Sequence, residues 1–445
     1  MNQNNINISV SVGELIDKFS ILEIKKERIN DNLEKLKEIE NEYEHLSVSK
    51  QYISTDYITK FFYKILKWIN NRIYDMTNEM KKLKMEDESF PKISFEIFEY
   101  NQKRFRIKNL FNNIFNSKIK EQKSYSSYDA ILIIENEDIF YEKIPEINYL
   151  MTVYDKILLK PNFKKLIYKK YSNVCKYDET NVNMNDYSIV NINDIVISND
   201  MNEIFSFEPI KYLGSGHLGD MIHTLSVINE NYLQNGRKGI LYVSDKINVF
   251  HYPLIKTFND TFEIINSQKY ISKYCIYDET PIDIDLGSWR SSNLLYKNNW
   301  YTIFKSIYNV EWGKRKWLNL PNIEKWNDKL IITCSNQRLP SGKIDVILNK
   351  YKNEDIYYVT QDIENYNLFI KKYDIKNLKC YITESLYEMI CIINSCKLLF
   401  SNLSSPLAFA FGLHKESIVF LHRNLTDNIH INNLPYINKL LTINE

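Results

Sequence analysis

The stretch Tyr212-Leu-Gly-Ser-Gly-His-Leu-Gly-Asp-Met-Ile-His-Thr-Leu-Ser-Val-Ile-Asn229 places three of the chain's ten glycines within six residues. An apolar run ends at Leu213, before the glycines. After them, apolar residues recur at helical spacing, at Met221, Ile222, Leu225 and Ile228. The pattern predicts a strand, a tight glycine turn and a helix N-terminus. Glycine lets the backbone approach a ligand, and the first helical turn has unpaired N–H groups. The loop is therefore predicted to bind an anionic or hydroxyl-rich ligand.

As a bare pattern, the three glycines also fit the G-x-G-x-x-G fingerprint of dinucleotide-binding folds, with Asp245 available as the acidic residue after the second strand. Asp220 disfavours this interpretation, because a carboxylate directly after the third glycine would repel a diphosphate. A nucleotide site stays the second interpretation of the loop. A carboxylate in the first turn of a helix is stabilised by the helix dipole, so Asp220 is predicted to be a proton acceptor.

The segment His217-Leu-Gly-Asp-Met-Ile-His-Thr-Leu225 resembles the glycine loop of heptosyltransferase-like enzymes of glycosyltransferase family 9. The pattern of that family runs small-x-G-D-[VI]-[LI]-H-[TA]-L-P. Asp220 falls on the position of the family's general base. This chain has Ser226 where the family usually has proline, a difference in local helix chemistry and not in the reacting group.

Composition bounds the other classes of function. The 445 residues, 44% of them hydrophobic, suggest two to four domains with buried cores. A net charge of +1 with mixed signs gives no electrostatic case for a nucleic-acid partner. The six cysteines form no C-x-x-C pair and indicate buried thiols in a reducing compartment, without a structural zinc site. The first residues lack the pattern of a signal peptide, and no apolar run could span a bilayer, so a cytoplasmic location is expected.

The N-terminal segment is predicted to be a helical hairpin. Ser11 and Glu14 form a capping-box pattern, and Leu15, Leu22, Ile29, Leu36 and Tyr43 recur every seven residues, which predicts one long helix. A second helix is expected at about 57–83 and a third helical stretch at 95–115.

Residues 8–126 also resemble a small bacterial domain of uncharacterised function that is often found near surface-polysaccharide enzymes. Val10-Ser-Val-Gly-Glu-Leu-Ile-Asp-Lys18 looks like its opening signature, and Glu121-Gln-Lys-Ser-Tyr125 belongs to its closing one. The favoured interpretation of the charged residues is that they cap and pair within the hairpin; the alternative is a surface for an acceptor or a partner, including a second copy of the chain. These residues are Glu14, Asp17, Lys18, Glu23, Lys25 and Arg104.

Residues 127–203 alternate short apolar runs, at 130–134 and 187–190, with stretches rich in Asn and Asp. We interpret them as a connecting module that could add strands to the edge of the following domain.

From residue 204 the pattern alternates strand, loop and helix, with strands expected at 210–213, 239–243, 261–265 and 274–277. This predicts a parallel, doubly wound sheet. Asp283-Ile-Asp285 invites comparison with the D-x-D that holds a metal and a sugar diphosphate in another glycosyltransferase fold. That interpretation is disfavoured, because the tripeptide is common by chance and no single nucleotide-binding unit precedes it. Arg290, in an exposed-looking Trp-Arg pair at the end of the next strand, is predicted to bind an acceptor hydroxyl or anion.

A Trp-rich stretch at 311–326 looks like a linker to a second sheet, whose strands are expected at 329–334, 356–360, 379–383 and 397–400. Its loop at 335–343 resembles the family's donor loop, with Arg338 and Lys343 as candidates to stabilise the departing diphosphate; the alternative is that both are solvated surface cations. At 401–412, Asn402, Ser404 and Ser405 precede an apolar helix with Pro406 at its first position, which suits a phosphate. The acidic and histidine positions of the family's pattern are not reproduced there.

The chain is thus predicted to be α/β, with two Rossmann-like doubly wound domains of the kind called GT-B after an α-helical hairpin domain. The domains expected are 1–126, 127–203, 204–322 and 323–445. Ligands bind at the carboxyl ends of strands in such sheets, so the loops at 214–220, 287–290, 335–343 and 401–406 should converge.

The resemblance and the residues together predict an inverting, metal-independent glycosyltransferase with Asp220 as its base. A nucleotide-diphosphate sugar is the expected co-substrate, without a further cofactor, and the acceptor is a glycan or another hydroxyl compound. The alternative is an inactive sugar-nucleotide-binding or scaffold protein that assembles through the helical domain. The acceptor side is assigned to Gly216, His217, Gly219, His223 and Arg290, although His223 could equally serve in the core or as a cap.

Overall fold

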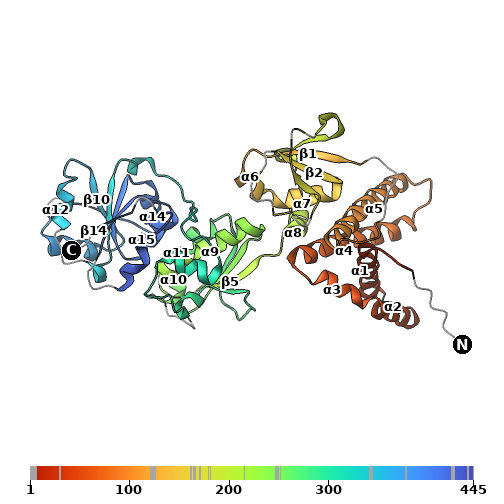
Figure 1. Ribbon diagram of the computed structural model, residues 1–445, viewed down its shortest axis with the longest axis horizontal. Coiled ribbons are helices and arrows are strands. Elements are labelled where there is room, and N and C mark those ends of the chain that lie inside the picture. The colour runs from red at the N-terminus through yellow and green to blue at the C-terminus, as the bar shows by residue number, and fades with distance from the viewer. Residues whose placement is uncertain are drawn as a thin grey trace. The chain divides into compact units, whose positions relative to one another are not determined.

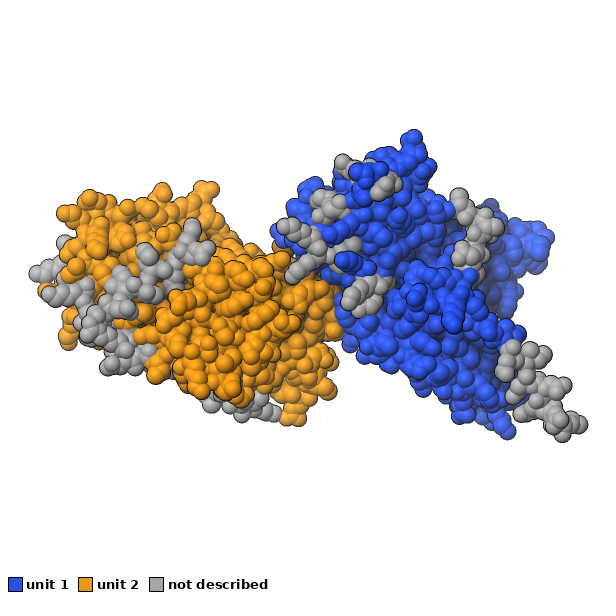
Figure 2. All heavy atoms as spheres, viewed as in Figure 1, with its two compact units in different colours: residues 1–208 blue, residues 209–445 orange. Residues whose placement is uncertain are grey.

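The computed structural model divides the chain into two compact units, residues 1–208 and residues 209–445, which are coloured separately in Figure 2. Each unit is considered by itself. The residues that the structure describes are 8–29, 32–120, 127–160, 163, 167–169, 172–178, 180, 182–214, 216–245, 250, 252–339, 344–375, 378–421, 426–437 and 440–443.

The first unit begins with helices α1 (Val12–Arg28) and α2 (Leu33–His45), where the heptad pattern predicted one long helix. That prediction is wrong because the chain has a new helix cap at Asn32. The Asn32 side chain accepts a hydrogen bond from Lys35 N (3.0 Å) and starts α2 afresh. The turn η1 (Ser47–Ser49) and the short helix α3 (Lys50–Ile53) follow.

Helices α4 (Tyr57–Met80) and α5 (Ser89–Ile114) confirm the two further helices expected from the sequence, although α5 begins earlier than predicted. Asp56 and Thr59 form a reciprocal capping box at the start of α4. Helices α1, α4 and α5 pack against one another (Figure 1), and Phe62, Leu66 and Phe111 are fully buried among them.

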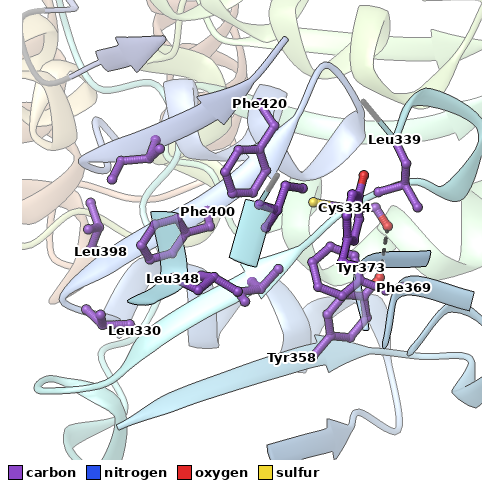
Figure 3. Close-up of a cluster of buried hydrophobic side chains, with 13 residues drawn as sticks. Leu330, Cys334, Leu339, Leu348, Tyr358, Phe369, Tyr373, Leu398, Phe400 and Phe420 are labelled. Carbon is purple, nitrogen blue, oxygen red and sulfur yellow. Dashed lines mark hydrogen bonds between the residues drawn. The ribbon is translucent and has the colours of Figure 1, made fainter. Parts of the chain in front are cut away.

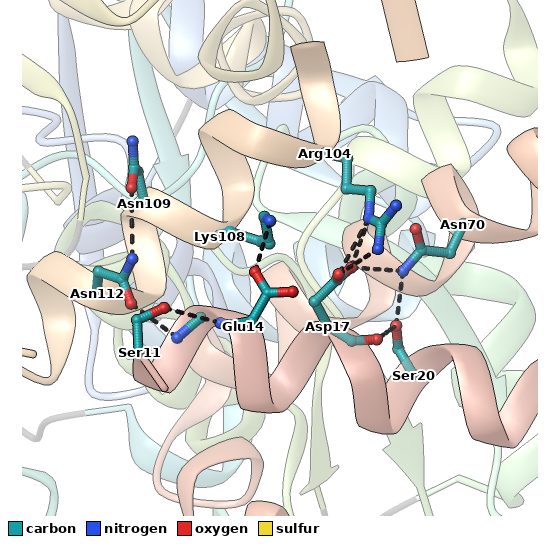
Figure 4. A network of polar contacts seen from close by, with 10 residues as sticks. Ser11, Glu14, Asp17, Ser20, Asn70, Arg104, Lys108, Asn109 and Asn112 are labelled. Atoms are coloured by element: carbon teal, nitrogen blue, oxygen red, sulfur yellow. Dashed lines mark hydrogen bonds and ion pairs between the residues drawn. The ribbon is translucent and has the colours of Figure 1, made fainter. Parts of the chain in front are cut away.

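Polar contacts tie these three helices together, as Figure 4 shows. Arg104 on α5 donates from Nε to both Asp17 oxygens (2.9 and 3.0 Å), and Asn70 on α4 donates to Asp17 Oδ1 (2.9 Å). The Ser11 hydroxyl accepts a hydrogen bond from Glu14 N (3.1 Å), which is one half of the predicted capping box. The Glu14 carboxylate forms an ion pair with Lys108 (2.8 Å). These contacts agree with the interpretation of the charged residues as caps and ion pairs.

Residues 127–203 form a sheet of their own, which corrects the interpretation that they extend the edge of the next domain. Strands β1 (Asp129–Ile133), β2 (Lys156–Lys160), β3 (Val174–Lys176) and β4 (Ser188–Asn191) are all parallel, in the order β3-β2-β1-β4. Helices α6 (Glu137–Glu142) and α7 (Ile144–Val153) connect β1 to β2. After the turns η3 (Met184–Asp186) and η4 (Ile192–Asp194), α8 (Asn199–Phe205) ends the segment. The sheet packs on the helices through α5 and α7.

The second unit contains two further parallel sheets. The first has β5 (Ile210–Gly214), β6 (Gly239–Val243), β7 (Ile271–Ile276) and β8 (Ile284–Asp285), in the order β7-β6-β5-β8. Its helices are α9 (Leu218–Asn235), α10 (Leu254–Asn266) and α11 (Trp300–Tyr308). The strand predicted at 261–265 is wrong. Those residues lie in α10, where Thr257, Thr261, Ile264 and Ile265 are buried at helical spacing.

The second sheet of this unit has β9 (Leu330–Thr333), β10 (Ile356–Thr360), β11 (Lys379–Ile382), β12 (Leu398–Asn402), β13 (Ser417–Phe420) and β14 (Leu440–Ile443), in the order β11-β10-β9-β12-β13-β14. Helices α12 (Ile344–Asn349) and α13 (Ile363–Tyr373) contribute to the core in Figure 3, where Phe369 lies near Tyr358, and Phe400 near Phe420. Helices α14 (Leu386–Ser395) and α15 (Ser405–Gly412) complete the connections.

Helix pairs join the two sheets of this unit, because α9 packs against α15 and α10 against α14. Two tryptophans of the stretch predicted to be a linker are buried in this unit. Trp312 and Trp317 are 1% exposed, and Trp317 donates from Nε1 to Ile222 O (3.0 Å). The remaining short turns are η5 (Ser288–Ser291), η6 (Glu324–Trp326), η7 (Asn336–Arg338) and η8 (Thr426–Ile431). The predicted fold class, two Rossmann-like sheets after an α-helical region, is confirmed.

Candidate active site

In the four-stranded sheet of the second unit, the strand order reverses at β5, which lies between β6 and β8. Ligands of parallel sheets bind outside the carboxyl ends of the strands at such a point. Asp220 lies in the first turn of α9, after β5, and Arg290 lies in η5, after β8. Their side chains meet in an ion pair, with Arg290 Nη2 2.8 Å from Asp220 Oδ2. Both are mostly buried, with side-chain exposures of 20% and 24%.

The glycine loop has the conformation that its sequence predicted. Gly216 has a φ of +90°, in the left-handed region that favours glycine. Gly219 lies beside the start of α15, because a Cβ atom placed on Gly219 would be 3.6 Å from Ser405 Cα and 3.8 Å from Ser405 Oγ. The glycine loop and the loop that precedes α15 therefore adjoin, although they belong to different sheets.

The second sheet reverses its strand order at β9, between β10 and β12, and the predicted donor residues gather at this point. Asn402 is fully buried, accepts from Ser335 N (3.0 Å) and donates to Ser335 O (2.7 Å), so it ties the end of β12 to the loop after β9. Arg338 donates to Leu403 O (2.9 Å) and pairs with Asp427 (3.2 Å). Lys343 lies outside the described residues.

Two helix N-termini lie together at this place without a side-chain cap. The N-cap residues are His217 for α9 and Ser404 for α15, and neither side chain accepts from its own helix. The Ser404 hydroxyl instead donates to Asn402 Oδ1 (2.7 Å). By helix geometry, the first N–H groups of α9 have no intrahelical acceptor, so they are available to an anion. At the start of α15, Pro406 has no N–H and Leu407 N donates to Ser404 O (3.0 Å), so the N–H available there is that of Ser405.

His223 lies in the core and not beside Asp220. Its ring is 4.8 Å from Trp300 and 5.6 Å from Trp312, centroid to centroid, and it also faces Phe411 (5.9 Å). Burial, with a contribution from His430, lowers the pKa of His223 to about 3. His223 is therefore neutral at physiological pH, and the structure does not bring it together with the ion pair. His217, in contrast, is exposed at the helix start.

The carboxylates of the D-x-D tripeptide are engaged with backbone. Asp283 accepts from Lys211 N (2.8 Å), and Asp285 accepts from Gly287 N (2.7 Å). Among the described residues, no group of three or more His, Cys, Asp or Glu side chains could hold a metal ion.

A cavity of about 490 Å³ lies between α10 and the loops that follow β10 and β11. Its lining includes Asp260 and Glu263 from α10, with Gln361 after β10 and Glu384 after β11. None of the predicted site residues lines it. The cavity is nevertheless at the carboxyl edge of the second sheet, where Rossmann-like sheets bind ligands.

The sequence missed two neighbours of the site. Trp289, which looked exposed, is 5% exposed, and the Arg290 guanidinium lies over its ring, 4.4 Å from the centroid. The adjacent Trp-Arg pair was the available signal. Asp427, the partner of Arg338, is distant in sequence and gave no signal.

No family model matches this chain, and no curated protein matches its sequence. Among solved structures, a glycosyltransferase family 9 protein from Veillonella parvula DSM 2008 is 9% identical, with a TM-score of 0.38, over 54% of this chain and 87% of that protein. The dodecameric iron-containing heptosyltransferase TibC, solved with ADP-D-beta-D-heptose, is 10% identical, with a TM-score of 0.37, over 53% of this chain and 63% of its own. The E. coli heptosyltransferase WaaC, solved with ADP, is 10% identical, with a TM-score of 0.33, over 53% of this chain and 93% of its own.

No described helix is long and apolar enough to cross a membrane. Each of these three solved structures is matched over about half of this chain, 53–54% of its residues.

Proposed function

We propose that the protein is an inverting, metal-independent glycosyltransferase that uses Asp220 as its general base and a nucleotide-diphosphate sugar as its donor. The observation that carries the proposal is that the loops at the two points of strand reversal, one in each sheet, adjoin each other. Asp220 lies in the first turn of α9, and a Cβ atom placed on the adjacent residue Gly219 would be 3.6 Å from Ser405 Cα at the start of α15. A proton acceptor and an anion-binding helix start are thereby neighbours.

In the proposed reaction, the acceptor hydroxyl gives its proton to the Asp220 carboxylate while its oxygen attacks the anomeric carbon of the donor sugar. The bond from that carbon to the diphosphate oxygen breaks on the opposite face, and the electron pair leaves with the nucleoside diphosphate. One displacement inverts the anomeric configuration. General-base catalysis of this kind typically contributes about 10²–10⁴-fold in rate.

The developing charge on the diphosphate is met by fixed donors. These are the Ser405 N–H at the start of α15 and the cation of Arg338, which Leu403 O and Asp427 hold in place. Donors fixed before the reaction contribute about 3–4 kcal/mol each where a single one has been removed from comparable sites. In this proposal Asn402 and Ser404 shape the loop, because their mutual hydrogen bond occupies them.

The cavity beside α10 offers room for the nucleoside. Its 490 Å³ falls in the range of small-molecule sites, about 300–1,000 Å³. Glu263 and Glu384 provide acceptors for ribose hydroxyls or for the amino group of a base. The acceptor substrate would then approach from the side of Asp220 and His217.

The test is a transfer assay with a panel of nucleotide-diphosphate sugars, in wild type and in Asp220→Ala. Turnover should fall by about 10² or more, with little change in donor affinity measured by titration, because the base acts after the donor binds. Activity should survive a chelator. Full activity of the variant, or a requirement for manganese, would contradict the mechanism. Donor binding without turnover in wild type would instead support the inactive, sugar-nucleotide-binding alternative.

A further inference from the structure

The guanidinium of Arg290 is held on three sides. Nη2 lies 2.8 Å from Asp220 Oδ2, the Trp289 ring lies beneath the group with its centroid 4.4 Å from Cζ, and the backbone of Gly216 closes the third side. Only 20% of the side chain is exposed. An arginine whose only role is to bind a ligand would not need all three contacts.

Gly216 is shaped to Arg290. A Cβ atom at Gly216 would lie 2.1 Å from Arg290 Nη2 and 2.7 Å from Cζ, closer than any real contact. The glycine loop and the end of β8 therefore fit each other through this guanidinium. The second glycine of the loop is explained by an internal side chain, in addition to any approach of a ligand.

The support under Arg290 is itself fixed. Trp289 packs edge-on against Trp300, with centroids 5.0 Å apart, and its backbone N–H donates to the Tyr308 hydroxyl (3.4 Å) on α11. The turn before it is closed by the hydrogen bond from Gly287 N to Asp285 Oδ1 (2.7 Å). A long arginine side chain ordinarily loses much rotamer freedom when it is fixed, and a stacked, supported guanidinium reduces that cost at the moment of reaction.

We propose that Arg290 is a positioning residue, which orients the Asp220 carboxylate through Oδ2 and leaves Oδ1 to receive the acceptor proton. The inference rests on the proposed function and replaces the acceptor-binding role expected for Arg290 from the sequence. The pair fixes the carboxylate rotamer, and Gly216 and Trp289 fix the guanidinium in turn. Asp220 is the catalytic residue, and Arg290 acts through it.

Steady-state kinetics distinguishes a positioning role of Arg290 from an acceptor-binding role. A residue that positions the base lowers kcat when it is removed, because the carboxylate no longer meets the hydroxyl in the reactive geometry, whereas KM for the acceptor changes little. A misplacement of about 1 Å can cost on the order of 10²-fold in rate. A residue that binds the acceptor raises KM instead.

The experiment measures kcat and acceptor KM for the full chain with Arg290→Ala, Arg290→Lys and Gly216→Ala. We expect Arg290→Ala to lose about 10–100-fold in kcat. Added guanidinium ion should restore part of this loss, whereas Arg290→Lys, which keeps the charge without the fork, should fall in between. Gly216→Ala should reproduce the loss of kcat, and adding it to Arg290→Ala should cost less than the sum of the two. Arg237→Ala, in the loop between α9 and β6 and outside the site, is the control.

A raised acceptor KM with unchanged kcat in Arg290→Ala would overturn the positioning role and leave the proposed function standing. Unchanged kcat in Arg290→Lys together with no rescue by guanidinium in Arg290→Ala would also overturn it. Absence of transfer by wild type with every donor would overturn the proposed function and this inference together. Circular dichroism of each variant distinguishes loss of positioning from loss of folding, and Arg290→Lys keeps the test valid if Arg290→Ala does not fold.

Discussion

Two Asp–Arg pairs on helices, Asp17–Arg104 on α1 and Asp220–Arg290 in the first turn of α9, differ in how far each carboxylate is already hydrogen-bonded. Asp17, with a side chain 1% exposed, receives Arg104 on both oxygens and Asn70 on Oδ1. Asp220 receives, among the described residues, one hydrogen bond, at Oδ2, and is 24% exposed. A saturated, buried carboxylate stabilises a fold, whereas a half-satisfied one at the edge of a sheet can accept a proton. Both pairs have a close-approach glycine nearby, Gly13 and Gly216.

The largest effect is expected from breaking the first pair. Asp17→Ala removes the buried carboxylate that pairs with Arg104 and accepts from Asn70, and losing one member of a buried pair costs about 3–5 kcal/mol. The free energy of unfolding, measured by urea titration, should fall by that amount. Lys18→Ala, on α1 like Asp17, removes an exposed ion pair with Glu42 on α2 and should change the free energy of unfolding by less than about 1 kcal/mol. Equal effects of the two variants would contradict the interpretation.

The glycine beside the first pair gives the next effect. A Cβ atom on Gly13 would lie 2.2 Å from the backbone oxygen of Lys108, and backbone cannot move aside as a flexible side chain does. Gly13→Ala should therefore destabilise the protein by about 1–3 kcal/mol, the usual cost of overpacking. Gly219→Ala, whose nearest contact would be an ordinary 3.6 Å, should cost less when both variants are compared by urea unfolding. A Gly219→Ala loss as large as that of Gly13→Ala would show that backbone conformation, and not close approach, sets both costs.

His223 is a third buried ionisable group to compare with Asp17 and Asp220. Among the described residues, no carboxylate pairs with it. Its pKa in the folded protein, about 3, lies below the ordinary value of 6.5, so between these values the unfolded chain binds a proton that the folded protein does not. Stability is fully present above pH 6.5 and is lost as pH falls, at about 1.4 kcal/mol per pH unit. The unfolding free energy of wild type minus that of His223→Gln should fall between pH 7 and pH 5. A difference independent of pH would contradict the burial of a neutral imidazole.

The sequence predicted the elements with strong local signals. The glycine loop between β5 and α9 was found because glycine spacing, apolar periodicity and the first-turn Asp220 all agree. The six-stranded sheet was largely recognised for the same reason, since β9, β10 and β12 are short apolar runs between turn residues. Helix α10 was mistaken for a strand, because Thr261-Phe-Glu-Ile-Ile265 is rich in β-branched residues, and packing decided against that local preference.

What depends on long-range contact could not be predicted. The partners of Asp220 and Asn402 lie in segments that follow other strands. No local pattern predicts that Arg290 contacts Gly216 or that Asn402 binds Ser335. The sheet at 129–191 was missed because β3 has three residues and β2 is a short run bounded by lysines. The heptad at 15–43 predicted one helix, because periodicity does not register a cap such as Asn32 inside a repeat.

The smallest effect on the free energy of unfolding is expected for Asp220→Asn, the variant that removes the proposed base. Asp220→Asn keeps the shape of the side chain and loses an ion pair that solvent partly screens, together with a favourable charge at the start of α9, each worth about 1 kcal/mol or less. The amide can still accept a hydrogen bond from Arg290 at one atom. The midpoint of urea unfolding should therefore differ little from wild type, while transfer falls as proposed above. In Asp17→Asn the order is reversed, because that carboxylate balances a buried guanidinium on both oxygens: stability drops, and the fraction that remains folded should transfer sugar at the wild-type rate. A large loss of stability in Asp220→Asn would make Asp220 a structural anchor like Asp17, and the distinction between the two pairs would fail.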